Sequence, residues 1–310
     1  MIMEKEKLKE RLLFSEGNLH VYADITKKEF PELYEKIRAI SEKAFKIPNA
    51  YDRFDETYRY LVCIAEYSIP GGIHFDSEKE WEVVSFYRYI PCKDAFTEEE
   101  PNFDLSTSNF YEYTTRFKTL LPVTLELGRS VVNPDAKASN GLLTIWKGLG
   151  CLIDHYSKNN IQYLFGEVSL QKSIYDIENL FENDALLSIV SCFIMNFYNE
   201  DFIIPKNEMD GFSKAELLQF AKVKGFEGKD FSKDSNRLKK ILKDKELERP
   251  HLFFYYTNLV NGKGINMFLP VDNKLLNCFE MGILLKISQI DKVRLARYKP
   301  KNGYRQEAFM

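Results

Sequence analysis

The feature that most constrains the fold is a strand, a helix and a second strand in direct succession between residues 122 and 170. Residues 122–132 are mostly apolar and β-branched, and residues 161–170 repeat this pattern after Asn159-Asn160 ends the helix. The helix begins near residue 139, and its apolar stripe has helical spacing: Leu142, Trp146, Leu149, Ile153 and Tyr156. Such a unit predicts two parallel strands joined by a right-handed crossover, with Trp146 in the core.

Antiparallel strands are predicted earlier in the chain. Residues 58–67 and 81–91 are rich in β-forming residues, and a polar stretch with Pro70-Gly71-Gly72 separates them, which favours a long hairpin. Because both runs are apolar on both faces, we expect central strands between helical layers. Residues 31–45 have the spacing of an amphipathic helix that packs on a larger surface.

The remaining segments carry weaker patterns. Residues 94–113 hold six acidic residues and no Lys or Arg, which is typical of a solvated connection with at most a short helix. Gly262-Lys263-Gly264 is interpreted as a hairpin turn between two late strands. Three late strands are predicted, at 252–260, 265–271 and 278–288.

Composition excludes several classes of protein. Of the 310 residues, 45% are apolar and 29% are charged, as in globular chains. The formal net charge is −3, so no global positive field attracts nucleic acid or an anionic membrane. The five cysteines and four histidines are scattered, which predicts neither a disulfide framework nor a metal site.

No membrane-spanning or signal segment is expected. The longest charge-free run, residues 185–199, has 15 residues and is too short and too polar to span a bilayer. The first residues alternate Lys and Glu and contain no apolar core of a signal peptide. We therefore expect a reduced, cytoplasmic protein.

Two charged residues, Glu126 and Arg129, lie inside the otherwise apolar strand 122–132. Burying either charge costs free energy unless it has a partner, so this strand is a candidate site; the alternative is a structural ion pair. Residues three apart in a regular strand point to opposite faces, so both charges reach one pocket only if a β-bulge shifts the register. Gly128 lies between them, and a bulge at Leu127-Gly128 would also free backbone N–H groups.

Several segments together resemble a known family. The most specific is Leu-Glu-Leu-Gly-Arg-Ser-Val-Val-Asn-Pro-Asp, followed by the Trp-bearing helix and by Tyr-Leu-Phe-Gly-Glu-Val-Ser-Leu. Phe54-Asp55-Glu56 and Phe86-Tyr87-Arg88-Tyr89 add to it. Over residues 35–200 the sequence resembles the hemolysin-like branch of the GNAT acyltransferase superfamily. That branch includes ornithine and glycine N-acyltransferases that use acyl carrier protein, with N-acyl-homoserine-lactone synthases as distant relatives.

The resemblance implies that strands 122–132 and 161–170 separate, so that a phosphopantetheine arm passes between them. An amine then attacks the thioester, which requires a base for the ammonium proton and a donor for the developing oxyanion. The resemblance implies that Glu126 is the base or holds the amine, and that a free N–H near Gly128 or Arg129 is the donor. Because an ordinary carboxylate is a weak base, this role of Glu126 requires burial or a relay through water.

Other residues are assigned to the substrates. Arg129, or Arg88 on the neighbouring strand, would hold a carboxylate such as that of an amino-acid acceptor through its planar guanidinium. Asp55 would orient a neighbouring arginine, although a loop acid of this kind is expected to be exposed. Ser169 and Glu167 are further substrate-binding candidates, and an acid at position 167 departs from the family pattern and would repel a donor phosphate.

The donor phosphate is assigned to the start of the helix near residue 139. CoA-dependent GNAT enzymes carry a Gln/Arg-x-x-Gly-x-Gly/Ala turn there, which wraps a pyrophosphate. Residues 135–141 read Asp-Ala-Lys-Ala-Ser-Asn-Gly, and this single glycine favours a carrier-protein arm with one phosphate. The candidates for holding it are Lys137, Ser139, Asn140 and Gly141. Exposed lysines here and in 214–249 would dock the acidic carrier protein, or simply solvate the surface.

These arguments predict an α/β fold with a GNAT-like mixed central sheet whose splayed parallel strands are flanked by helices. The acyltransferase core would occupy residues 1–200, and residues 201–310 would form a C-terminal extension integrated with it. The predicted reaction moves a fatty acyl group, 3-hydroxylated as in the family, from acyl carrier protein to the α-amine of a glycine- or ornithine-type amino acid in aminolipid synthesis. Acyl-CoA is the alternative donor.

Neither a metal nor a resident cofactor is expected, and the contact with the inner membrane face would be transient and peripheral. Two other functions are considered. The first is a non-catalytic binder of acyl chains or acyl carrier protein, for which Glu167 and the single-glycine turn argue. The second is a lactone-type signal synthase with S-adenosylmethionine as the acceptor. The sequence leaves the acceptor and the oligomeric state open.

Overall fold

The structure is a computed structural model, and it describes residues 2–68, 79–96, 103–171, 186–199, 201–206, 214–247, 249–260, 262 and 264–309. The chain folds into two compact units. The first comprises Met1–Ala95, Leu125–Ile161 and Lys292–Met310, and the second comprises Phe96–Thr124 and Gln162–Asp291. Each unit contains residues from before and from after residue 200, the predicted boundary between the acyltransferase core and the C-terminal extension.

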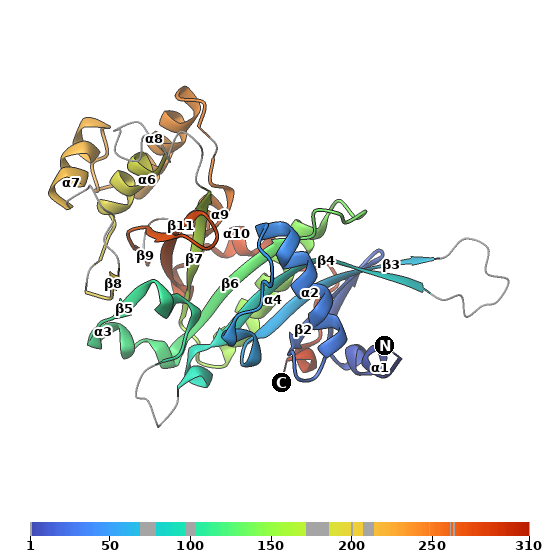
Figure 1. The fold of residues 1–310 in the computed structure, drawn as a ribbon. Helices are drawn as coiled ribbons and strands as arrows, with labels where there is room; N and C mark the ends of the chain where they lie inside the picture. Colours follow the sequence, from blue (N-terminus) through green and yellow to red (C-terminus); the bar gives the residue numbers. More distant parts are fainter. Residues whose placement is uncertain are drawn as a thin grey trace. The chain divides into compact units, whose positions relative to one another are not determined.

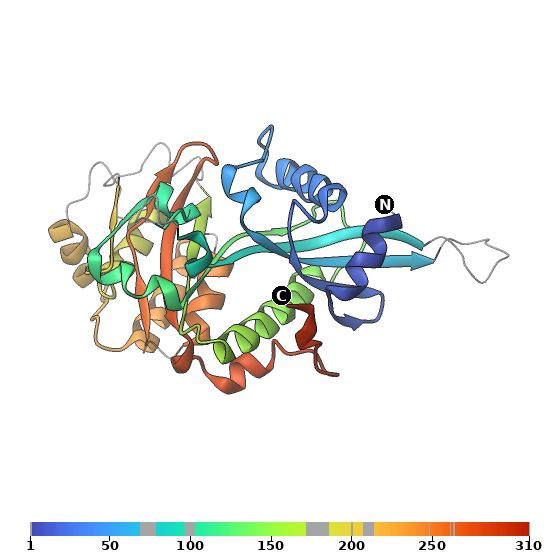
Figure 2. The same cartoon turned by 90° about the horizontal axis from the view of Figure 1, so that it is seen from below.

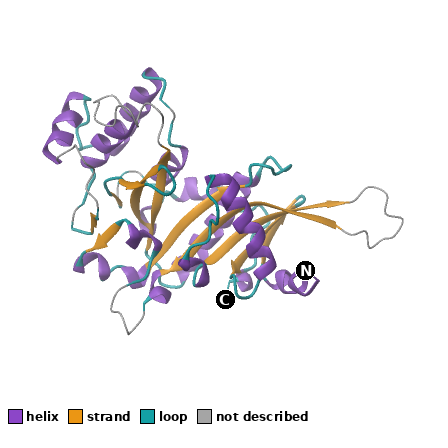
Figure 3. Cartoon of the chain, in the orientation of Figure 1, coloured by secondary structure: helices purple, strands orange, loops and turns teal. Residues whose placement is uncertain are grey.

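Helices and strands occur in both units (Figure 3), so the mixed α/β class is confirmed. The strands are β1 (Leu12–Glu16), β2 (Leu19–Ile25), β3 (Arg59–Ser68), β4 (Lys79–Pro91), β5 (Tyr111–Tyr113), β6 (Thr124–Val132), β7 (Tyr163–Gln171), β8 (Ile203–Pro205), β9 (Ile265–Met267), β10 (Val271–Asn273) and β11 (Cys278–Lys286). The helices are α1 (Ile2–Glu10), α2 (Pro31–Phe45), α3 (Thr115–Lys118), α4 (Gly141–Lys158), α6 (Leu186–Met195), α7 (Lys214–Val223), α8 (Phe231–Asp244), α9 (His251–Leu259) and α10 (Lys292–Ala296).

The sheet of the first unit has the strand order β1–β2–β3–β4–β6, with antiparallel neighbours (Figure 1). The predicted hairpin of β3 and β4 is confirmed, and its Pro70-Gly71-Gly72 connection lies outside the described residues. Figure 2 shows α2 (blue) and α4 (light green) on opposite sides of these strands. Tyr60 and Val62 of β3 pack with α2, and Leu61 faces Gly148 of α4, which explains why the strand is apolar on both faces. The hairpin of β1 and β2 was not predicted.

Helix α4 follows the predicted stripe. Trp146, Leu149, Ile153 and Tyr156 are buried, whereas Leu142, in the first turn, is 39% exposed. The C-terminal segment of the chain, residues 292–309, packs on this helix: the rings of Trp146 and Tyr298 lie 5.4 Å apart. The approach is so close that a Cβ atom on Gly150 would overlap the backbone oxygen of Tyr298.

The second unit is described by itself. Strand β11 pairs antiparallel with β7 along one edge and with β9 and β10 along the other. Strands β5 and β8 form a separate pair, and α6 packs against α7 and α8 (Figure 1). Because β6 belongs to the first unit from Leu125 onwards and β7 to the second, the parallel pairing and the separation of these strands stay predictions.

The predicted strand 252–260 is wrong, because this segment forms α9. Its aromatic residues favour strands by propensity, but in the helix Phe253, Tyr256 and Thr257 share one buried face, and the Thr257 hydroxyl donates to the Phe253 carbonyl oxygen at 2.8 Å. The segment around Gly262 therefore joins a helix to a strand and is not a hairpin turn; residues 261 and 263 lie outside the described residues. The predicted strand 265–271 is divided between β9 and the start of β10.

The predicted solvated connection 94–113 is wrong for its described part. Leu105 and Tyr111 are buried, and β5 pairs with β8. The acidic residues 98–100 lie outside the described residues. The apolar run from Leu186 forms α6, and no described helix is long and apolar enough to cross a membrane.

Replacing Gly150 by alanine should destabilise the first unit. In an open helix this change stabilises by roughly 1 kcal/mol, but here the methyl group meets backbone that cannot rotate away, so we expect a net loss of about 1–3 kcal/mol in the free energy of unfolding. Both tryptophans, Trp81 and Trp146, lie in the first unit, so their fluorescence during denaturant unfolding measures this change. Ser157→Ala, at an exposed site on the same helix, is the control. A Gly150→Ala protein as stable as wild type would contradict the packing described.

Candidate functional site

Strand β6 contains the bulge predicted from its charges. Phe86 of β4 pairs with Val131 and Arg88 pairs with Gly128, so Arg129 and Ser130 together oppose one residue of β4. Arg129 has φ +46°, a left-handed conformation that is unfavourable for a side chain with a Cβ. The bulge is thus confirmed, at Arg129-Ser130 instead of Leu127-Gly128.

The bulge places the two charges of β6 on one face of the sheet. Glu126 pairs with Ile90, which is two residues from Arg88 and therefore shares its face. Beyond the bulge, the Arg129 guanidinium reaches Asp55, which Arg88 also contacts. Without the extra residue, Arg129 would point to the opposite face, towards α4.

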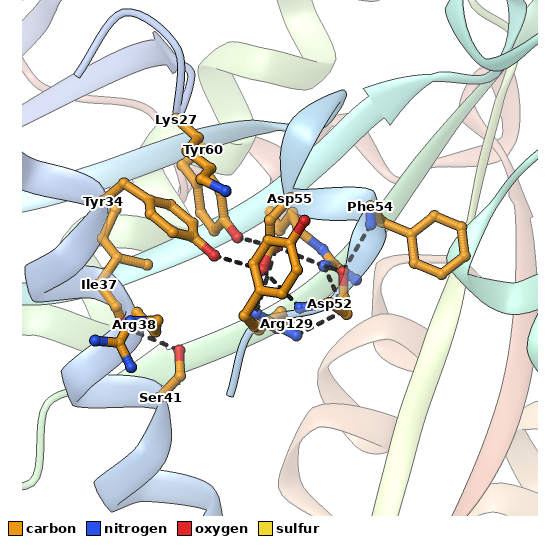
Figure 4. Close-up of polar contacts among 12 residues, drawn as sticks. Lys27, Tyr34, Ile37, Arg38, Ser41, Asp52, Phe54, Asp55, Tyr60 and Arg129 are labelled. Atoms are coloured by element: carbon orange, nitrogen blue, oxygen red, sulfur yellow. Dashed lines mark hydrogen bonds and ion pairs between the residues drawn. The ribbon is translucent and has the colours of Figure 1, made fainter. Parts of the chain in front are cut away.

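Two arginines and two aspartates form a compact cluster on this face. Arg88 Nη1 donates to Asp55 Oδ1 and to both carboxylate oxygens of Asp52, each at 2.8 Å. Arg129 Nη2 donates to Asp52 Oδ2 at 2.6 Å and its Nη1 donates to Asp55 Oδ2 at 3.1 Å. Figure 4 shows Asp52, Asp55 and Arg129 joined in this way. The formal charges of the four side chains cancel.

Asp55 lies at the centre of the cluster and is completely buried. Tyr34 of α2 and Tyr60 of β3 donate their hydroxyls to it at 2.7 and 2.5 Å (Figure 4). Burial alone would raise the pKa of Asp55, but Arg129, Arg88 and the two tyrosine hydroxyls outweigh it and lower this pKa below its usual value. The expectation of an exposed loop acid at Asp55 is therefore wrong.

The local sequence explains why the side chains of Asp52 and Asp55 both point to the arginines. Residues Arg53–Glu56 form one 3-10 turn, and Asp52 caps it by accepting the backbone N–H of Phe54 at 3.0 Å. Residues three apart on such a turn lie on one side, so Asp52 and Asp55 face the arginines together. Asp52, Tyr34 and Tyr60 were not predicted, although the Asp-x-x-Asp spacing before a strand was a usable signal.

Glu126 adjoins this cluster through Tyr58. Glu126 is fully buried and accepts a hydrogen bond from the Tyr58 hydroxyl, and the Tyr58 ring lies 4.8 Å from the Arg88 guanidinium carbon. Tyr58 was not predicted as part of the site. A phenol between a buried carboxylate and a guanidinium can carry a proton between the carboxylate and a bound group.

Ser169 and Glu167 lie on β7, in the second unit. The exposed Ser169 donates its hydroxyl to buried Glu280 at 2.9 Å, and it lines a cavity of about 190 Å³ together with Leu170 and Leu186. Glu167 is half-buried, and its charge adds to burial in raising the pKa of Tyr111. Their role in binding a substrate stays a prediction.

The residues predicted to hold a donor phosphate lie at the start of α4. Ser139 and Asn140 are exposed. Gly141 is buried where the helix meets β4, and it packs so closely there that a Cβ atom would overlap Val84. The Lys137 backbone N–H donates to Glu82 at 3.1 Å, and its ammonium lies 3.9 Å from Glu80. These two acids oppose the binding of a phosphate to Lys137. Among the described residues, no group of three or more His, Cys, Asp or Glu side chains could hold a metal ion.

Residues 33–147 match the family model described as an acetyltransferase (GNAT) domain. The match contains most of α2 and all of β3, β4 and β6, and with them all four members of the cluster together with Glu126 and Tyr58. It confirms a GNAT-type domain and the acyltransferase class. The hemolysin-like, aminolipid-forming branch stays a prediction.

No curated protein sequence matches the chain. Among solved structures, it is similar to the CoA-dependent acyl-homoserine lactone synthase MesI at 10% identity and a TM-score of 0.33, with 90% of this chain and 92% of that chain covered. It is also similar to the CoA-dependent acyl-homoserine lactone synthase BjaI with MTA at 11% identity and a TM-score of 0.38, over 94% and 95% of the two chains. Similarities this weak assign no substrate to this chain.

The four-charge cluster should make the first unit sensitive to acid. Because the folded-state pKa of Asp55 lies below its unfolded value of about 3.9, its stabilisation is complete above that pH and is lost as the pH falls through the folded-state pKa. Asp55→Asn should lower the free energy of unfolding by about 3–5 kcal/mol at pH 7, and this difference from wild type should shrink below about pH 4.

Tryptophan-monitored unfolding over a pH series measures this difference. Asp94→Asn is the control, since Asp94 pairs with Arg59 at 3.0 Å in a partly exposed position, where the expected loss is at most about 1 kcal/mol. Equal losses for the two variants, or a difference that does not depend on pH, would disprove the central role of Asp55.

Proposed function

We propose that this protein transfers a fatty acyl group from the phosphopantetheine thioester of acyl carrier protein to the α-amine of an amino acid. One observation carries the proposal: within the segment that matches the GNAT domain, a bulge in β6 brings Arg129 onto the face of the sheet that already holds Arg88 and the buried carboxylate of Glu126. Acylation of an amino acid requires these groups, a proton acceptor for the amine and cations for its carboxylate.

In the proposed reaction the amine nitrogen bonds to the thioester carbonyl carbon, and the carbon–sulfur bond breaks. The ammonium proton passes to Glu126 through the Tyr58 hydroxyl, which donates to Glu126 in this structure. Backbone N–H groups at the bulge, near Gly128 and Arg129, stabilise the oxyanion. The amine nitrogen loses its second proton as the amide forms, and the departing thiolate of the carrier arm takes up this proton.

The substrates are assigned as follows. Arg88 and Arg129 hold the acceptor carboxylate, and the start of α4 with Ser139, Asn140 and Gly141 holds the single phosphate of the donor arm. The missing pyrophosphate turn favours acyl carrier protein over acyl-CoA as the donor. An acylated amino acid is amphiphilic, so a transient contact with the membrane surface would accompany its release.

A second candidate is a non-catalytic protein that binds acyl chains or acyl carrier protein. It is favoured by the acids beside Lys137, which oppose a donor phosphate, and by the complete burial of Glu126. Purified protein incubated with acyl carrier protein thioesters, or with acyl-CoA, and a mixture of amino acids distinguishes the two by mass spectrometry. Amide products support the enzyme; retained binding without thioester consumption supports the binder. A parallel incubation with S-adenosylmethionine as the acceptor detects a lactone-forming synthase.

If Glu126 accepts the proton, Glu126→Gln should lower kcat by about 10²- to 10⁴-fold, with a much smaller change in the acceptor KM. The amide retains the shape of the side chain and an oxygen that accepts from Tyr58, so the fold should persist, which circular dichroism checks. Glu29→Gln is the control, because Glu29 pairs with Arg11 in the same unit. Wild-type turnover by Glu126→Gln would remove Glu126 from the proposed mechanism.

A further inference from the structure

The two aspartates of the cluster differ in how firmly they are enclosed. Asp55 is completely buried and has hydrogen bonds from α2 and β3 as well as from the arginines. The Asp52 side chain is 33% exposed, and it accepts hydrogen bonds from Arg88, from Arg129 and from the backbone N–H groups of Phe54 and Asp55 in its own turn. Asp55 is thus a fixed counter-ion, whereas Asp52 closes the cluster on its solvent side.

The nitrogen atoms of the Arg88 guanidinium are unequally supplied with hydrogen-bond acceptors. Its Nη1 atom, with two hydrogens, serves three carboxylate oxygens of Asp52 and Asp55 at 2.8 Å each. Its buried Nε–H has no partner among the described residues. An unpaired buried donor is costly, and a guanidinium with an unused N–H can engage a further carboxylate oxygen.

Departure of the Asp52 carboxylate would leave two guanidinium groups with one buried aspartate. The remaining net charge of +1, with donors from Arg88 on β4 and Arg129 on β6, is complementary to one external carboxylate. A carboxylate restores the charge balance that Asp52 supplies. An amine without a carboxylate does not.

We propose that the carboxylate of the acceptor amino acid displaces Asp52 from the position between Arg88 and Arg129. This inference rests on the proposed function and names its acceptor class: amines that carry a carboxylate. Asp52 fills the site until such an acceptor binds, and it excludes simple amines, which gain nothing from the arginines. Asp52 therefore determines specificity without taking part in the chemistry.

Removing the Asp52 charge tests the proposal by direct binding. Asn and Ser both cap helical turns as Asp does, so Asp52→Asn and Asp52→Ser keep the 3-10 turn while removing the competing carboxylate. Isothermal titration calorimetry would use the twenty ordinary amino acids and ornithine, without any thioester. If Asp52 occupies the site for about nine-tenths of the time or more, the variants should bind their best ligand at least about tenfold more tightly than wild type.

Two controls make the result specific. The carboxamide of the same ligand should gain no affinity, and Asp94→Asn should bind like wild type, since Asp94 has nearly the same exposure (35%) and pairs with Arg59 elsewhere in the unit. Unchanged or weaker binding of all ligands by both Asp52 variants, or an equal gain for the carboxamide, would overturn the proposal.

Failure of this inference is separable from failure of the proposed function. If the wild-type protein forms amides but the Asp52 variants keep its acceptor affinity, only the displacement of Asp52 is wrong. If the variants bind amino acids more tightly but no thioester is consumed by wild type, the carboxylate site stands and the acyl transfer is wrong.

Discussion

One buried carboxylate, that of Asp55, connects four elements of the first unit. Arg88 reaches it from β4, Arg129 from β6, Tyr34 from α2 and Tyr60 from β3. A charge in a protein interior is tolerated only when partners replace the water that it has lost, and each of these elements supplies one partner. Asp55 in turn compensates two guanidinium groups that would otherwise be costly to bury. The helix α2 and three strands are therefore fixed relative to one another by polar contacts as well as by the apolar core.

The bulge in β6 is a consequence of this arrangement. Arg129 adopts an unfavourable backbone conformation, and its two aspartate partners supply the compensating interactions. The offset brings Arg129 onto the face that Glu126 shares with Arg88, where Tyr58 connects Glu126 to Arg88. The strained residue and the buried acid are thus parts of one polar network, whose members lie on α2, β3, β4, β6 and the turn before β3.

The sequence predicted those parts of the fold that follow from local patterns. The hairpin of β3 and β4, the helix α4 and the bulge each follow from a local pattern: two runs of β-forming residues separated by a Pro-Gly-Gly stretch, a stripe of helical period, and two charges three apart around Gly128. Prediction failed where a longer-range contact decides the outcome. The aromatic run of α9 favours a strand by propensity, but burial of one helical face outweighs it. Asp55 resembles a solvated loop acid until Arg88 and Arg129, 33 and 74 residues away, are placed beside it.

The first unit uses both ends of the chain. Its last segment reaches β1, where the Arg305 N–H donates to the Leu13 carbonyl oxygen at 2.9 Å, and α4, where Phe309 stacks on His155 at 4.2 Å between ring centroids. During translation, the residues of the second unit have all been synthesised by Asp291, whereas the first still lacks the segment that covers α4. The final packing of the first unit must therefore wait until residues 292–309 have been synthesised, and a nascent chain arrested before residue 292 would leave the Trp146 side of α4 uncovered.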